Sequence, residues 1–196
     1  MTSVLVECKG IPGHAGAEYT RCASAIQGLC AQITKLYTLR DDEKEISFNA
    51  GFITGGTAEN VVAPTASCKC EFRYFNQASR EPLMEKIRAI VAEEPVPGVT
   101  TTVTFGASHP ACDINEKSQA LIDMAQAIAA KQGRSLPHEK TGGAGDISIA
   151  ALAGIGVLDG FGLYGRGMHT VQEYCVKESV PRQIALATAM LKAVCS

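Results

Sequence analysis

One histidine has the surroundings of a catalytic or metal-binding residue. His169 lies in the stretch YGRGMHTVQEY (164–174), between glycines and a short polar run. Glycines let the backbone approach a ligand closely, and loops present functional side chains on a rigid scaffold. A protein zinc site needs three or four ligands, and the sequence contains no His-x-Asp or His-x-x-x-His pair. The motif therefore predicts at most one ligand of a larger site.

Three further polar residues and one glycine-rich stretch are candidates for a binding site. His14 lies in GIPGHAGAEY, Asn60 in GGTAENVVAP and Arg73 in CEFRYF. Each has a structural alternative: a hydrogen-bonded surface histidine, an asparagine that forms a turn, and an arginine that lies over an aromatic ring. The stretch TGGAGDIS (141–148) is either a tight connection or, through free N–H groups at a helix start, a site for an anion.

Composition narrows the class of partner. The chain has 196 residues, of which 46% are hydrophobic and 19% charged, so it is globular. The net charge of -2 and the lack of a Lys/Arg run argue against a nucleic acid or an anionic membrane as the partner. No apolar stretch is long enough to span a membrane, and the first ten residues lack the layout of a signal peptide. We therefore expect a small-molecule partner, no nucleic acid and no membrane.

The eight cysteines are dispersed along the chain and include no Cys-x-x-Cys motif. This spacing predicts that most of them are reduced thiols in the core, which favours a cytoplasmic protein. Cys68 and Cys70 lie two residues apart in a strand-like stretch, so both should point to one face.

The first half of the chain alternates the signals of strands and helices. Residues 3–9 (SVLVECK) alternate apolar and polar side chains, as a half-buried strand does, and residues 19–36 carry apolar side chains at helical spacing. The further expected elements are strands at 46–53 and 66–75, a helix at 81–93 and a strand at 99–105. The order β-α-β-β-α-β predicts a ferredoxin-like fold.

The second half predicts part of an α/β domain. The expected elements are helices at 117–131 and 178–194, strands at 135–140 and 156–163, and a glycine-rich turn that enters a further helix near residue 146. Only about two strands are predicted here, whereas a parallel sheet with helices on both faces normally has more. This half therefore looks like an incomplete portion of an α/β domain.

Taken together, five motifs resemble a known family. PGHAGA, GGTAENVVAPTASCKCEFRY, TGGAGDISIAALAG, LDGFGLYGRGMHT and EYCVKESVPR occur in this order and cover nearly the whole chain. They resemble the zinc-dependent peptidases that include glutamate carboxypeptidase (carboxypeptidase G type), acetylornithine deacetylase, succinyl-diaminopimelate desuccinylase and aminoacylases. The ordered set is specific, because a chance match to all five motifs is far rarer than a match to one.

The resemblance implies a domain organisation and an activity. In this family a ferredoxin-like domain is inserted into an α/β catalytic domain, mediates dimerisation and covers the active site. Residues 3–106 would be this dimerisation or lid domain, and residues 107–196 would be the C-terminal portion of the catalytic domain. The complete protein would be a homodimeric zinc metallopeptidase that hydrolyses the amide bond of a peptidyl or N-acyl amino acid.

The resemblance also implies roles for the candidate residues. His169 would be one ligand of a two-zinc site, in which the metal ions polarise the scissile carbonyl and activate water. Arg73 would bind the free carboxylate of the substrate, and Asn60 would add a hydrogen bond. His14 would reach into the active site of the other subunit and stabilise the oxyanion.

The glycine-rich loop would contact the substrate at the same end as Arg73, through the backbone of Thr141, Gly142 and Gly143. For Asp146, capping of the following helix is the preferred role.

The remaining catalytic groups of the family lie before the dimerisation domain: a His-x-Asp motif, a bridging Asp, a Glu-Glu pair and a further carboxylate. None of them precedes Ser3. We therefore expect that this chain alone lacks most metal ligands and the general base, binds zinc weakly and is inactive. The alternatives are a non-catalytic dimerisation or scaffold module and, for the first half only, a small-molecule-binding regulatory domain.

Overall fold

The computed structural model describes residues 1–195, which form two compact units. The first, called the sheet unit, comprises residues 1–113 together with residues 142–145. The second, called the helical unit, comprises residues 114–141 and the described residues from 146 onward. The assignment of residues 3–106 to a lid domain and of residues 107–196 to a catalytic domain stays a prediction.

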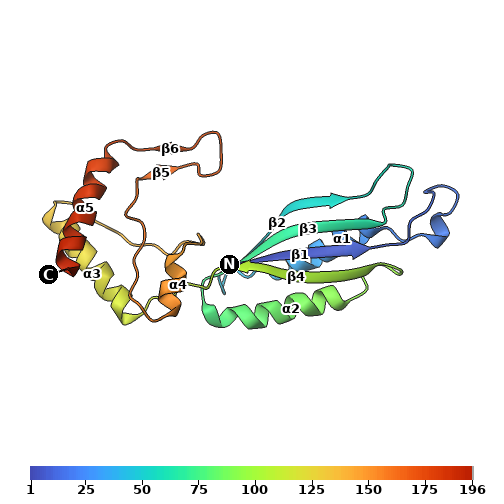
Figure 1. The fold of residues 1–196 in the computed structure, drawn as a ribbon, viewed down its shortest axis with the longest axis horizontal. Helices are drawn as coiled ribbons and strands as arrows, with labels where there is room; N and C mark the ends of the chain where they lie inside the picture. The colour runs from blue at the N-terminus through green and yellow to red at the C-terminus, as the bar shows by residue number, and fades with distance from the viewer. Residues whose placement is uncertain (196) are drawn as a thin grey trace. The chain divides into compact units, whose positions relative to one another are not determined.

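The sheet unit is a four-stranded antiparallel sheet with two helices on one face (Figure 1). Its strands β1 (Thr2–Lys9), β2 (Ile46–Gly55), β3 (Thr65–Tyr74) and β4 (Thr100–Ser108) lie in the spatial order β2-β3-β1-β4. The helices α1 (Ala25–Tyr37) and α2 (Arg80–Ala92) follow β1 and β3 in the chain. This order of elements confirms the predicted ferredoxin-like fold.

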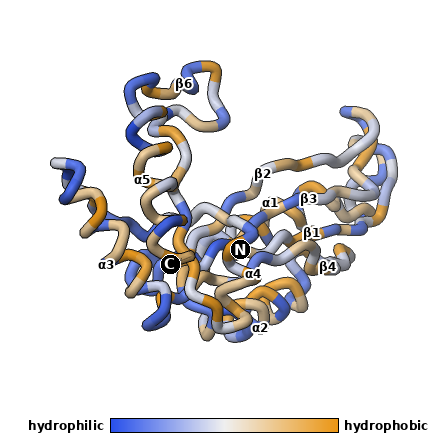
Figure 2. The backbone as a smooth tube through the Cα atoms, turned by 60° about the vertical axis from the view of Figure 1, so that its left-hand side comes forward, coloured by the Kyte–Doolittle hydropathy of each residue, from blue (hydrophilic) through white to orange (hydrophobic). Residues whose placement is uncertain are grey.

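Alternation of side chains gives the sheet one buried face. Val4, Val6 and Cys8 of β1 and Cys68 and Cys70 of β3 are buried in the core that the sheet forms with the two helices. The residues between them point to the opposite face, called the open face below, because successive side chains of a strand alternate. Figure 2 shows both hydrophobic and hydrophilic residues along these strands.

The helix α1 begins later than the sequence predicted. Ser24 has an extended backbone, and its side chain accepts a hydrogen bond from the N–H of Gln27 at 3.3 Å. This cap satisfies a free N–H group of a helix that starts at Ala25. Residues Tyr19–Arg21 form a separate 3-10 turn, η1, so the predicted start at residue 19 is wrong.

The helical unit contains three helices and a short ribbon. They are α3 (Glu116–Lys131), α4 (Ile147–Leu152), α5 (Ser179–Val194) and the antiparallel pair β5 (Gly165–Arg166) and β6 (Tyr174–Cys175). Helices α3 and α5 pack together through Ala125, Ala129, Leu186 and Met190, which are buried. The helices predicted at 117–131 and 178–194 are confirmed, each with a start that differs by one residue.

Two predicted strands and one predicted cap are wrong. Residues 135–140 and 156–163 form no strand, because a strand requires a paired neighbour and no described strand lies beside either segment. Asp146 occupies the N-cap position of α4, but it has a helical backbone and its side chain makes no capping hydrogen bond. A capping side chain normally needs an extended backbone at this position.

The cysteines are all free thiols, but only Cys8, Cys68 and Cys70 are buried. The expectation that most cysteines lie in the core is therefore wrong, whereas the shared face of Cys68 and Cys70 is confirmed. Burial raises the pKa of each of these three thiols. Among the described helices, none has both the length and the apolar character needed to cross a membrane.

Candidate functional site

His14 lies in an exposed loop that follows β1, and its ring orientation is fixed locally. Its Nδ1 accepts hydrogen bonds from the backbone N–H groups of Gly16 and Ala17, at 3.1 and 3.2 Å. A ring nitrogen that accepts two such bonds carries no proton, so the proton of the neutral ring is on Nε2. The backbone N–H of His14 also donates to Oε2 of Glu18 at 3.3 Å. The loop therefore presents Nε2–H as a donor toward solvent, as an oxyanion donor requires.

Asn60 lies beside His14 although the two are far apart in the sequence. The N–H of Ala15 donates to the carbonyl of Asn60 at 3.0 Å, and the N–H of Val62 donates to the carbonyl of Gly13 at 2.9 Å. His14 and Val61 thereby form an isolated antiparallel bridge. The structure thus joins the PGHAGA and TAENVVAP motifs in one pair of loops.

Arg73 lies near the C-terminal end of β3, on the open face. Its Nε donates to Oε1 of Glu71 at 2.6 Å, and its Nη1 donates to the carbonyl of Gly142. Gly142 belongs to the sheet unit, and a side chain there would lie 3.5 Å from the ring of Phe75 and 3.7 Å from Cδ of Arg73. The structure therefore brings Arg73 and the glycine-rich loop together, as the predicted substrate site requires. Thr141 and Gly143 flank this contact in the chain.

The two groups of candidate residues lie at opposite ends of the sheet. The loops of His14 and Asn60 adjoin the end where Lys9 pairs with Thr65, whereas Arg73 pairs with Ser47 at the other end. Residues 65–73 of β3 separate these ends, and eight steps along a strand amount to roughly 26 Å. One protomer therefore does not bring Asn60 or His14 to Arg73.

His169 lies in the helical unit, in the exposed turn between β5 and β6. The φ of His169 is +65°, and Gly167, two residues earlier, also has a positive φ, of +74°. A non-glycine residue in this left-handed region is uncommon and often marks a functional position. The N–H and the hydroxyl of Thr170 both donate to the carbonyl of Gly167, at 3.0 and 2.7 Å, and so close the turn around the histidine.

The residues present do not fit a complete metal site. Among residues 1–195, no three His, Cys, Asp or Glu side chains are grouped so that they could hold a metal ion. Because a protein zinc site uses three or four protein ligands, His169 could supply only one of them.

Two acidic contacts were not predicted from the sequence. Glu71 binds Arg73, and Glu18 binds the backbone of His14. Glu71 could have been found, because residues two apart on a strand share a face. The contact of Glu18 depends on the loop conformation, which no periodicity indicates.

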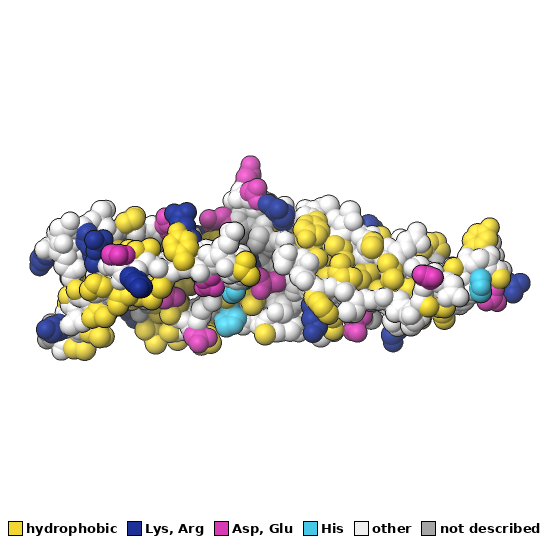
Figure 3. Space-filling view, turned by 90° about the horizontal axis from the view of Figure 1, so that it is seen from above, with side chains coloured by type: hydrophobic (Ala, Val, Ile, Leu, Met, Phe, Trp, Pro, Cys, Tyr) yellow, Lys and Arg dark blue, Asp and Glu magenta, His cyan; other side chains and the backbone are white. Residues whose placement is uncertain are grey.

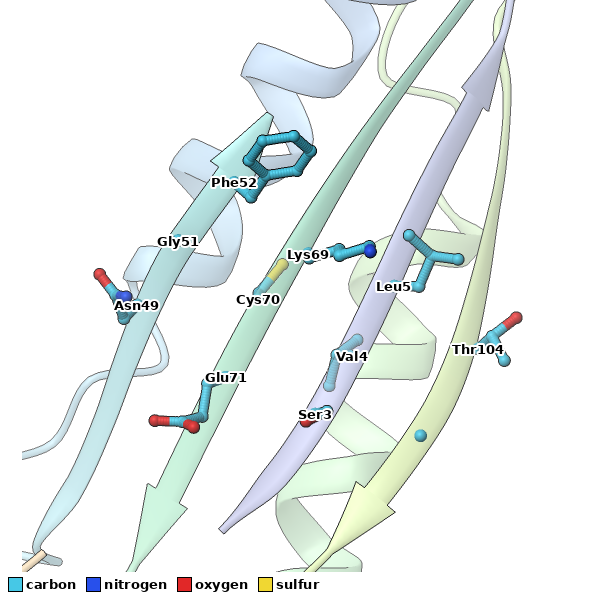
Figure 4. Close-up of a pocket in the computed structure, with 11 residues that line it drawn as sticks. Ser3, Val4, Leu5, Asn49, Gly51, Phe52, Lys69, Cys70, Glu71 and Thr104 are labelled. Atoms are coloured by element: carbon cyan, nitrogen blue, oxygen red, sulfur yellow. The ribbon is translucent and has the colours of Figure 1, made fainter. Parts of the chain in front are cut away.

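A groove crosses the open face, with a volume of about 520 Å³, and Glu71 is one of its lining residues (Figure 4). Other lining residues are Ser3 and Leu5 of β1, Asn49 and Phe52 of β2, and Lys69 of β3. None of the candidate residues predicted from the sequence lines this groove.

A comparison with protein families identifies the sheet unit. A family described as a peptidase dimerisation domain (M20_dimer) matches residues 1–99. The chain belongs to the M20 peptidase dimerisation-domain family. The predicted family resemblance is therefore confirmed, and the ferredoxin-like sheet is the M20 dimerisation domain.

Curated relatives extend the match beyond the M20 dimerisation domain. Carboxypeptidase G2 of Pseudomonas sp. (strain RS-16) is 26% identical over 190 residues, which cover 96% of this chain and 46% of the relative. The uncharacterized protein YqjE of Bacillus subtilis (strain 168) is 27% identical over 184 residues, which cover 93% of this chain and 49% of the relative. The chain thus spans about half the length of these relatives.

Solved structures share the fold of this M20 chain. Aminopeptidase PepT from Bacillus cereus ATCC 10987 superposes with a TM-score of 0.76 at 23% identity, over 100% of this chain and 52% of that chain. YXEP of Bacillus subtilis, described as a dinuclear metal-binding peptidase of the M20 family, has a TM-score of 0.68 at 16% identity, over 98% and 49% of the two chains. At these identities the likeness shows the fold alone.

Proposed function

We propose that this chain is part of a zinc-dependent M20 metallopeptidase of the glutamate carboxypeptidase type, which hydrolyses the amide bond of a peptidyl or N-acyl amino acid. The match to the peptidase dimerisation domain and the similarity to carboxypeptidase G2 over nearly the whole chain support this proposal. Because the described residues do not form a complete metal site, we propose that His169 supplies one ligand and that this chain alone is inactive.

The separation of the candidate residues is the observation on which the proposal depends. His14 and Asn60 lie at one end of the sheet and Arg73 at the other. In a two-fold dimer formed by antiparallel pairing of two β2 strands, opposite ends of the two sheets lie side by side. His14 and Asn60 of one subunit would then approach Arg73 of the partner subunit.

The edge strand β2 supplies a surface for this homodimer. It ends the sheet opposite β4 and exposes Phe52 and Ile53 by 58% and 56%. Ile26 and Tyr37 of α1 are also exposed, and Figure 3, which views the molecule from above Figure 1, shows hydrophobic side chains gathered on the surface of this unit. An open edge with exposed apolar side chains favours pairing with another chain. The β4 edge, in contrast, carries Thr100, Thr102 and Thr104.

In the proposed site each residue of this chain has one role. Arg73 binds the free carboxylate of the substrate, and the backbone of the loop Thr141–Gly143 lines the same end. Nε2–H of His14 donates a hydrogen bond to the oxyanion, and Asn60, beside it, contacts the substrate in the same site. The orientation of the His14 ring by Gly16 and Ala17 supports this role, because a preorganised donor stabilises charge that develops in the transition state.

Subunit mixing in the full-length protein tests this proposal. His14→Ala and His169→Ala homodimers should each lose about a hundredfold or more in turnover, because a transition-state donor and a metal ligand are removed. A purified heterodimer of the two variants should regain one working site, since one site then has an intact His169 and an intact His14 from its partner. A heterodimer as inactive as both parents would contradict a site shared between subunits.

Activity assays of the wild-type protein separate the enzyme from the alternative of a non-catalytic dimerisation module. A full-length wild-type protein that forms a dimer but hydrolyses neither peptidyl nor N-acyl amino acids with added zinc would support the scaffold. Turnover by this chain alone, abolished by a chelator, would show that residues 1–196 contain a complete site.

A further inference from the structure

The guanidinium of Arg73 is held by two protein groups. Its Nε donates to Oε1 of Glu71 at 2.6 Å, and its Nη1 donates to the carbonyl of Gly142. Glu71 and Arg73 lie two residues apart on the open face of β3, and their side chains are 29% and 35% exposed. They form an ion pair at the solvent boundary, where such a pair adds little stability. Its main effect is therefore on the orientation of the arginine.

Arg73 is the cation that forms an ion pair with Glu71, although the amino group of Met1 also interacts electrostatically with this carboxylate. The neighbouring cation on the same face, Lys69, lies 6.0 Å from the ring centroid of Phe52. Figure 4 shows Glu71 and Lys69 on β3, with Asn49 and Phe52 on the adjacent strand β2. Among the ion pairs of the described residues, that with Arg73 is the one that Glu71 forms.

Two fixed nitrogens define which edge of the guanidinium a ligand can reach. An arginine side chain has several rotatable bonds, and holding Nε and Nη1 removes most of that freedom before a ligand arrives. Nη2 has no hydrogen-bond partner among the described residues. A carboxylate can accept two parallel N–H groups of an arginine. Because Nε is occupied by Glu71 and one N–H of Nη1 by Gly142, the groups that remain for a ligand are the second N–H of Nη1 and those of Nη2, on the Nη1–Nη2 edge.

We propose that Glu71 is a positioning residue for substrate binding: its carboxylate holds Nε of Arg73 so that the Nη1–Nη2 edge faces the substrate carboxylate. This inference rests on the proposed function, in which Arg73 binds that carboxylate. Glu71 does not touch the ligand in this arrangement. Its negative charge also disfavours anions that approach through any other edge, which is a contribution to specificity.

The signal of the Arg73 Nε–H group tests the positioning role directly. In the ¹⁵N-labelled chain this signal is assigned by its loss in Arg73→Lys, and its exchange with water reports whether Nε is hydrogen-bonded. Glu71→Ala should accelerate this exchange about threefold or more, because a partly exposed charged hydrogen bond is lost. Glu71→Gln keeps an oxygen acceptor and should retain most of the protection.

Two controls separate this contact from a general loss of negative charge. Glu7 lies on β1, on the same open face, and forms no ion pair among the described residues, so Glu7→Ala removes a matched charge. Arg88 lies with Cζ 4.8 Å from the ring centroid of Phe105, and its Nε–H signal serves as an internal reference. Glu7→Ala should leave exchange at Arg73 Nε unchanged, and Glu71→Ala should leave exchange at Arg88 Nε unchanged. If Glu71→Ala leaves the Arg73 exchange rate unchanged, or Glu7→Ala raises it equally, the proposal is overturned.

A ligand titration distinguishes this inference from the proposed function. N-acetylglycine has an amide and a free carboxylate, and N-acetylglycinamide is its neutral counterpart. In the wild-type chain the acid, but not the amide, should shift the Arg73 signal. Absence of that shift would contradict the role of Arg73 even if Glu71 protects Nε. Glu71→Ala should bind the acid more weakly than Glu71→Gln, since both lack the charge and only glutamine keeps the acceptor; equal affinities would overturn the positioning role.

Discussion

The sheet unit and the helical unit differ in how much of their apolar surface they bury. The core of the sheet unit contains 19 buried apolar residues from both helices, the strands β1, β2 and β3, and the adjoining loops. The corresponding cluster of the helical unit contains four, which join α3 to α5. Four residues cannot cover the remaining apolar side chains of that unit, so large ones such as Ile149, Leu152 and Ile184 stay exposed by 60% or more.

This difference in buried apolar surface indicates which unit forms a complete hydrophobic core by itself. A sheet with helices on one face buries a complete layer without further elements. Exposed apolar side chains in the helical unit are typical of a surface that packs against more protein. In the proposed function that protein is the rest of the catalytic domain, which agrees with a chain that spans about half the length of its relatives.

The largest expected contrast between the units is in thiol reactivity. Cys68 is fully buried in the sheet unit, where burial raises its pKa, whereas Cys175 is exposed in the helical unit. A thiol reacts only when it is ionised and accessible to the reagent. Cys68 should therefore be alkylated only when the sheet unit opens transiently. We expect iodoacetamide to modify Cys175 at least about a thousandfold faster, as measured by peptide mass spectrometry over time. Equal rates at the two positions would contradict a closed core.

The same contrast explains what the sequence could predict. The alternation of SVLVECK and the helical spacing within the first half are local signals, and each corresponds to an element of the sheet unit. The segments 135–140 and 156–163 carry similar signals but form no strand, because the described chain provides no strand to pair with them. Periodicity predicts which face an element would bury, but not whether a partner is present.

The candidate site shows a similar division. The sequence motifs identified Arg73 and the glycine-rich loop, which the structure brings into contact. They did not reveal that His14 and Asn60 share one loop pair at the opposite end of the sheet, because that contact depends on the strand order. The ion pair of Glu71 with Arg73 also depends on the rotamers of both side chains. The spacing of the two residues allows these rotamers but does not determine them.

The second prediction compares one large core residue from each unit. Phe72 is 0% exposed and Leu186 is 2% exposed. Phe72→Ala should lower the free energy of unfolding by about 3–5 kcal/mol, because it removes a ring from the centre of a closed core. Leu186→Ala should cost about 2 kcal/mol, near the lower end for such substitutions, because its small open cluster can relax around the gap. Urea denaturation of each variant, followed by fluorescence of tyrosines and by circular dichroism, measures both values. If Leu186→Ala lowered the free energy of unfolding more than Phe72→Ala, the sheet unit would not be the more tightly packed of the two.

The third prediction tests the packing density of the sheet unit. Gly28 is buried in α1, and an added Cβ would lie 2.6 Å from Cγ1 of Val99, which is 1% exposed. Gly28→Ala should destabilise the protein by about 1 kcal/mol net, because overpacking outweighs the gain in helix propensity. Val99→Ala makes room for the new methyl group, so the double variant should be more stable than the sum of the two single changes predicts. Strict additivity in urea denaturation would show that the two residues do not compete for space.

The smallest effects are expected in the helical unit, where backbone conformation rather than packing should decide the outcome. Gly160 and Gly162 form a matched pair: an added Cβ would meet no atom within 4 Å at either position, and Nε2 of Gln183 donates to the carbonyl of both, at 3.2 and 3.0 Å. They differ in backbone conformation, since Gly160 has a φ of +89° and Gly162 lies outside the left-handed region.

Gly160→Ala should therefore cost less than about 1 kcal/mol net, because the strain of a side chain at positive φ is partly offset by the restriction of the unfolded chain. Gly162→Ala should be neutral or stabilise by up to about 1 kcal/mol, because alanine restricts only the unfolded chain there. Urea denaturation monitored by circular dichroism measures both changes. A loss at Gly162 as large as that at Gly160 would mean that this segment is packed as tightly as the sheet unit around Gly28, and the contrast between the two units would then not hold.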